Sequence, residues 1–157
     1  MLARCAAVAA VSILALAAPA GAVEPWDQEK VTELGKQLET ATNDLWQTFR
    51  LQPRPTMAQG QARSYFRLQQ QLRALRTEAR HLSRALQGGA GHDETLPSFE
   101  SMMQTIRAAE DNARRVFSGV EVRQKADAAR AVLNQMIPFY EADPTLLEPI
   151  GREPSPS

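Results

Sequence analysis

The chain has 157 residues, of which 43% are hydrophobic and 23% are charged, a composition typical of one ordinary globular domain. Its 18 basic and 18 acidic residues balance, so the overall charge gives no indication of a nucleic-acid or anionic-membrane ligand. Cys5 is the only cysteine, which excludes disulfides, cysteine-ligated zinc and covalently attached haem from the rest of the chain.

The N-terminal segment predicts a secretory signal peptide over residues 1–22. Arg4 supplies a short basic region, an uncharged apolar stretch follows, and the letters AGA at 20–22 form a small-x-small cleavage site. The apolar density covers only residues 6–18, whereas a membrane span needs about 20 residues. We therefore expect cleavage at that site, export to the periplasm or the medium, and no stable membrane span afterwards. Retention as an uncleaved membrane anchor is the alternative.

Breaks rich in proline and glycine divide the rest of the chain into four segments with helical periodicity. We expect helices over about Asp27–Leu51, Met57–Gln87, Leu96–Phe117 and Val120–Ala142. No segment alternates with a period of two, so no strand is expected. The second segment has apolar residues at spacings of three and four throughout, which is the pattern of a coiled-coil seam: Tyr65, Leu68, Leu72, Leu75, Ala79, Leu82 and Leu86.

Capping signals accompany these breaks. Asp27 is placed to cap the first helix. The segments at 56–59 and 118–121 begin with Thr56 and Ser118 and have the pattern of capping boxes. Gly88 is expected to end the second helix in a left-handed turn, and Pro138 is expected to kink or loosen the last turn of the fourth helix.

Short connections predict antiparallel neighbours, which gives an all-α, up-down-up-down four-helix bundle over residues 23–143. The proline-rich residues 144–157 are expected to form a disordered tail. An elongated pair of helical hairpins and an intertwined dimer are alternative arrangements of the same helices, so the oligomeric state stays open.

Glu78 and His81 have the spacing Glu-x-x-His, which can supply two ligands to a metal site in a four-helix bundle. At about 100° per residue, His81 lies about 150° from the centre of the apolar stripe, so it should face solvent. The other histidine, His92, falls in a glycine-rich linker. The pair is the one metal candidate, and we expect no bound cofactor.

Haem held between a histidine and a methionine is a related possibility. The candidate axial methionines are Met102, Met103 and Met136, which at helical spacing also suit core filling. Because His81 is expected to point outward, this site is incomplete. Haem or metal binding is therefore the alternative function.

Four arginines of the second helix lie within about 80° of one another: Arg73, Arg76, Arg80 and Arg84. Like charges at i and i+4 repel by a few tenths of a kcal/mol per pair. The helix contains one acid, Glu78, on its opposite shoulder. Acids of the first or third helix could compensate, and so could an acidic protein or an anionic envelope polymer outside the chain. A solvated helix face is the plain alternative.

Glu110 falls inside the apolar stripe of the third helix, and Arg107 and Arg114 are spaced to pair with it. A buried acid can mark a functional site. No base, nucleophile or metal ligand accompanies Glu110 in the sequence, so it completes no catalytic set. We therefore expect a non-enzymatic exported protein that binds a protein partner or an anionic envelope component.

Overall fold

The computed structural model describes residues 25–52, 59–116 and 119–141. The predicted signal peptide, the predicted tail and the capping position Thr56 lie outside these residues. The described chain forms four helices and no strand: α1 (Gln28–Leu51), α2 (Gln59–Gln87), α3 (His92–Ala113) and α4 (Val120–Tyr140). The all-α prediction is confirmed. Among these helices, none combines the length and the apolar character required to cross a membrane.

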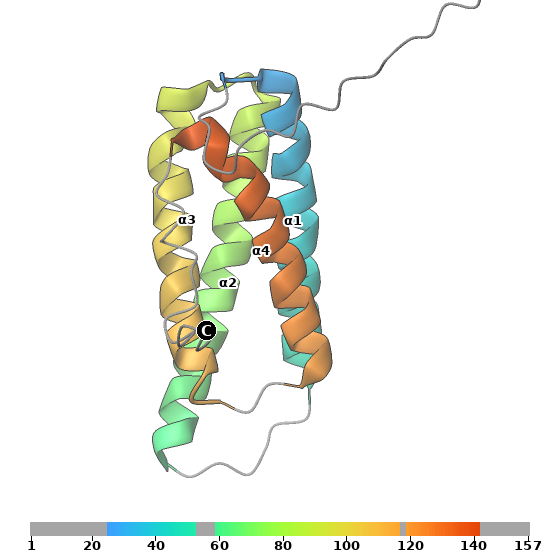
Figure 1. Ribbon diagram of the computed structural model, residues 1–157. Helices are drawn as coiled ribbons and strands as arrows, with labels where there is room; N and C mark the ends of the chain where they lie inside the picture. The colour runs from blue at the N-terminus through green and yellow to red at the C-terminus, as the bar shows by residue number, and fades with distance from the viewer. Residues whose placement is uncertain (1–24, 53–58, 117–118, 142–157) are drawn as a thin grey trace, which may run out of the picture.

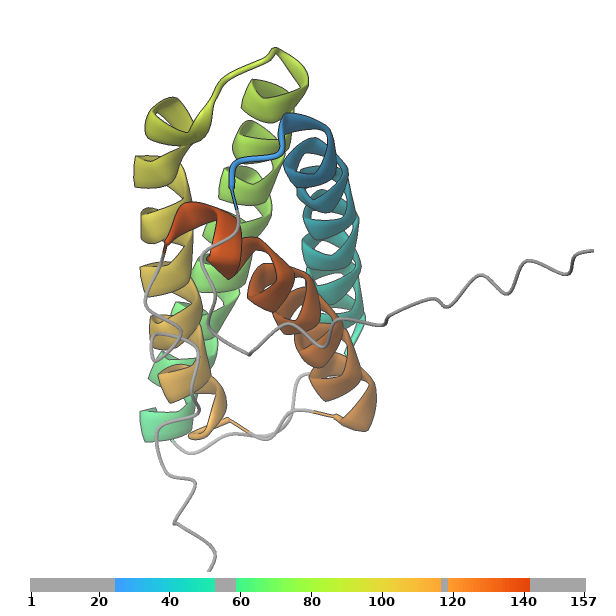
Figure 2. The ribbon, with the colours of Figure 1, turned by 45° about the horizontal axis from the view of Figure 1, so that its top comes forward.

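Successive helices run in opposite directions, as expected for an up-down-up-down bundle (Figure 1). α1 packs against both α2 and α4, and α2 also packs against α3. α3 and α4 contact each other much less than these three pairs do. α4 runs obliquely, with its C-terminal end beside α3 and its N-terminal end away from it (Figures 1 and 2). The bundle is therefore closed on three sides and open along part of the fourth.

The periodicity of α2 correctly identifies its inward face. All seven residues of its predicted seam are buried: Tyr65, Leu68, Leu72, Leu75, Ala79, Leu82 and Leu86. Asp27 caps α1 as predicted, with its carboxylate accepting a hydrogen bond from the Lys30 amide at 3.0 Å. The sequence predicts the buried face of α2 and the N-cap of α1 correctly, because each depends only on residues close together in one helix.

α3 begins at His92, one turn earlier than the expected Leu96. The Glu94 carboxylate accepts a hydrogen bond from the Gly91 amide at 3.0 Å, and the Thr95 hydroxyl donates to the Gly91 carbonyl at 2.8 Å. These two bonds satisfy the amide and the carbonyl of Gly91 at the N-terminal end of α3. Pro97 is consequently inside the helix.

Two expected turns are displaced by one residue. Gly89, with φ of 87°, takes the left-handed conformation after α2 that was expected of Gly88. The N-cap of α4 is Gly119, which makes no side-chain hydrogen bond, and not Ser118, which lies outside the described residues. α4 continues through Pro138 and ends in a left-handed residue, Glu141.

The buried apolar side chains form two clusters. We call the cluster around the α2–α3 turn, at the top of Figure 1, the upper core: Val31, Leu34, Leu38, Leu75, Ala79, Leu82, Leu86, Phe99, Met102, Met103, Ile106, Leu133, Met136, Ile137, Phe139 and Tyr140. The lower core lies toward the other end: Leu45, Trp46, Phe49, Tyr65, Leu68, Leu72, Ala109, Val116 and Val122.

In the upper core, Tyr140 joins α4 to α3. Its ring stacks on Phe99 with centroids 4.2 Å apart, and its hydroxyl shares a 2.9 Å hydrogen bond with the Thr95 hydroxyl. Trp26 packs edge-on against the same ring at 5.3 Å. Burial raises the pKa of Tyr140 to about 12, although the hydrogen bond to Thr95 opposes this shift.

Candidate functional site

Glu78 and His81 do not face a common site. His81 is exposed, whereas Glu78 is half-buried against α3. One oxygen of the Glu78 carboxylate lies 3.4 Å from the Ser101 hydroxyl and 3.5 Å from the Thr105 hydroxyl. Glu78 thus contacts α3, whereas His81, the other candidate metal ligand, faces solvent. The described part of the chain holds no group of three or more His, Cys, Asp or Glu side chains that could bind a metal ion.

His92 is part of α3 and not of a flexible linker, which corrects the expectation for this residue. Its ring packs on Tyr140 at 5.8 Å and meets Trp26 edge-on at 5.5 Å, while Nδ1 lies 2.7 Å from the Asp93 carboxylate. These contacts cover the end of the upper core. The candidate axial methionines are buried within that core: Met102, Met103 and Met136.

One arginine of the α2 stripe is neutralised by α1. Arg80 Nε lies 3.3 Å from a carboxylate oxygen of Glu39, and both side chains are partly exposed. Arg73 and Arg84 are exposed, and Arg76 is half-buried. These three form no ion pair with any residue that the structure describes.

Other acids of α1 have different partners. Glu33 lies 3.7 Å from Lys36 on its own helix, and Asp44 lies 3.2 Å from Lys125 of α4. The acids expected to compensate the stripe are therefore mostly engaged elsewhere. Within residues 25–52, 59–116 and 119–141, only one of the four arginines, Arg80, has an acidic partner.

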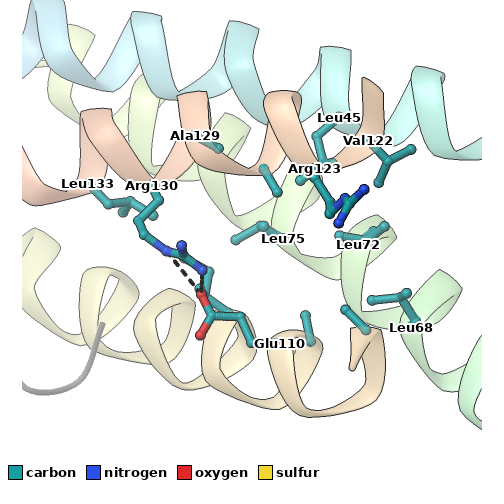
Figure 3. Close-up of a pocket in the computed structure, with 14 residues that line it drawn as sticks. Leu45, Leu68, Leu72, Leu75, Glu110, Val122, Arg123, Ala129, Arg130 and Leu133 are labelled. Atoms are coloured by element: carbon teal, nitrogen blue, oxygen red, sulfur yellow. Dashed lines mark hydrogen bonds and ion pairs between the residues drawn. The ribbon is translucent and has the colours of Figure 1, made fainter. Parts of the chain in front are cut away.

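Glu110 is partly buried, but its expected partners are wrong. It pairs with Arg130 of α4, whose Nε lies 3.1 Å from the carboxylate and whose terminal nitrogen also binds it (Figure 3). Arg114 is exposed, and the Nε of Arg107 is buried without a hydrogen-bond partner among the described residues. Arg130 also contacts Asp127 at 3.5 Å.

The sequence contains a signal for Arg130, although the expected partners of Glu110 did not include it. At 100° per residue, Arg130 lies on the shoulder of the α4 apolar stripe, within about 80° of its centre. Arg123 is seven residues earlier and therefore lies on the same shoulder, two turns away. Both arginines thus border the side of α4 that faces the open seam with α3.

That open seam contains a cavity of about 100 Å³, which no sequence pattern predicted. Its floor is apolar and consists of side chains from α2 and α1: Leu68, Leu72, Leu75 and Leu45. Figure 3 shows Leu68, Leu72 and Leu75 of α2 at the gap between α3 and α4. The cavity is continuous with the surface and therefore accessible to a ligand.

Short side chains form the walls of this cavity. α3 contributes Ala109 and Ala113, and α4 contributes Ala126 and Ala129. Helices can approach closely across alanine, but α4 diverges from α3 here, so the alanines leave space between them. The Glu110–Arg130 ion pair crosses one side of the opening.

No protein family model matches the chain, and no curated protein or solved structure matches it either. The arguments for function therefore rest on the two surfaces described above, the arginine face of α2 and the seam between α3 and α4.

Proposed function

We propose that this protein is a small, exported, non-enzymatic binding protein whose α2 arginine face contacts an anionic partner in the cell envelope. The proposal is supported by one observation. Only Arg80 of the four arginines is neutralised by a described residue, which leaves like charge at Arg73, Arg76 and Arg84. Export is inferred from the signal-peptide pattern of residues 1–22.

The geometry of α2 suits a repeated anionic ligand. Arg73 and Arg84 are eleven residues apart, which corresponds to about 16 Å along a helix, and both side chains are exposed. Arginine binds carboxylates and phosphates through two parallel hydrogen bonds, so an ordered row of guanidinium groups favours a partner with regularly spaced anions. An acidic protein surface and an anionic polymer both have this chemistry.

A pair of charge reversals on α2 tests the proposal. In the double variant Arg73→Glu with Arg84→Glu, capture of the partner from envelope extracts should fall at least about tenfold. The matched control is Arg63→Glu with Arg67→Glu, which changes the same charge on exposed positions of a different face of the same helix. Protease treatment of the extract distinguishes a protein partner from a polymer.

Equal capture by the two double variants would contradict the proposal. Loss of capture in the Arg73 and Arg84 variant alone, with unchanged thermal unfolding, would support it. N-terminal sequencing of the exported protein tests the inferred cleavage independently, since the mature chain should begin at Val23. Absence of the protein from both the periplasmic fraction and the medium would contradict the export proposal.

A further inference from the structure

The opening between α3 and α4 has the properties of an apolar ligand site. Its cavity of about 100 Å³ is lined mainly by apolar side chains. An apolar ligand that enters this open space would displace water from those side chains, which the hydrophobic effect favours. The cavity is open at the surface, so an elongated ligand can extend beyond it.

The floor of the cavity is long and continuous. Leu68, Leu72 and Leu75 follow one another along the buried face of α2. Leu68 and Leu75 are separated by about 10 Å along the helix axis. Because a volume of only about 100 Å³ extends along this floor, the space above the leucines is narrow, and its alanine walls are apolar. This shape suits an unbranched hydrocarbon chain lying along the helices better than a bulky ring.

The charges at the opening differ between its two ends. Arg130 is engaged by Glu110 and Asp127, so its charge is already compensated. Arg123 borders the same cavity two turns earlier on α4, is exposed, and forms no ion pair with a described residue (Figure 3). An apolar chain with one anionic head group complements this arrangement.

We infer that the seam between α3 and α4 binds a fatty acid, with its hydrocarbon chain on the leucine floor and its carboxylate at Arg123. A carboxylate matches the planar guanidinium fork of arginine. The site is on the opposite side of the bundle from the α1–α2 seam, to which Arg80 and Glu39 belong. The inference therefore stands independently of the proposed anionic partner.

Calorimetric titration with dodecanoate below its micelle concentration tests this site in the exported full chain. We expect saturable binding with one ligand per chain and much weaker binding of dodecanol, which lacks the charge. Ala126→Phe places an aromatic ring in the cavity and should weaken binding at least about tenfold. Arg123→Gln should weaken it about fivefold to fiftyfold.

Arg115→Gln is the matched charge control, because Arg115 is exposed and does not border the cavity. Its dodecanoate affinity should equal that of the native chain. Ala113→Leu provides a second, smaller obstruction if Ala126→Phe alters the circular dichroism spectrum. No saturable binding, equal affinity for dodecanol, or unchanged affinity in the obstructed variants would overturn the inference. Dimerisation that displaces dodecanoate would also overturn it and assign the seam to a second copy.

Discussion

The upper and lower cores share the same four helices but are filled by different kinds of side chain. In the upper core, α3 and α4 are joined by the Phe99–Tyr140 stack and by the hydrogen bond between the Tyr140 and Thr95 hydroxyls. In the lower half, the same two helices face each other through alanines and one ion pair between Glu110 and Arg130.

This difference shows that side-chain volume, and not helix formation, decides where the bundle closes. The stripe of α4 continues without a break from Val122 to Tyr140. Large residues fill the space at its C-terminal end, whereas Ala126 and Ala129 leave it unfilled near its N-terminal end. Binding function is favoured where packing is incomplete, because a tightly filled core offers no space to a ligand.

Removing a large side chain from each half gives the largest expected contrast. Phe99→Ala should lower the free energy of unfolding by about 3–5 kcal/mol, because Phe99 is fully buried and stacked. Leu72→Ala should cost about 2–3 kcal/mol, since its neighbours border existing space into which they can relax. Urea unfolding measures both. A larger cost for Leu72→Ala would contradict the contrast between the cores.

High pH should weaken the upper core through Tyr140. Its pKa is raised to about 12 in the folded protein from 10.0, so the unfolded state releases this proton first. The contribution of Tyr140 to the free energy of unfolding is therefore complete below about pH 10. It declines by about 2–3 kcal/mol as the pH rises toward 12. Tyr140→Phe should remove this decline, at a cost of about 1 kcal/mol at neutral pH for the lost bond to Thr95. Urea unfolding at neutral and alkaline pH provides the measurement, and an identical pH dependence in both proteins would refute the assignment.

The same substitution at two alanines should have opposite effects in the two halves. Ala79→Leu should destabilise the protein by about 1–3 kcal/mol, because Ala79 is fully buried in the filled upper core. Ala126→Leu should stabilise it by about 0.5–2 kcal/mol by occupying the cavity. Thermal unfolding compares the two variants directly. If both changes destabilise the protein, the lower half is more tightly packed than the structure indicates.

The charged residues show that helical periodicity does not predict ion pairs between different helices. The stripe of α3 correctly placed Glu110 close to the core, but the partner assigned to it came from the same helix. The observed partner, Arg130, is 20 residues away on α4. Spacing within a helix identifies neighbours at i and i+4. It contains no information on which side chain of another helix lies opposite.

The sequence by itself determined the four helices, their direction and their apolar faces, because helical periodicity and turn-forming residues act over a few positions. It also contained the residues whose hydrogen bonds start α3 at His92, namely Gly91, Glu94 and Thr95. Only the tertiary structure decided that Glu39 neutralises Arg80, that Arg130 pairs with Glu110, and that a cavity separates α3 from α4. The reason is that the gap between two helices depends on the volumes that all four helices contribute at the same level.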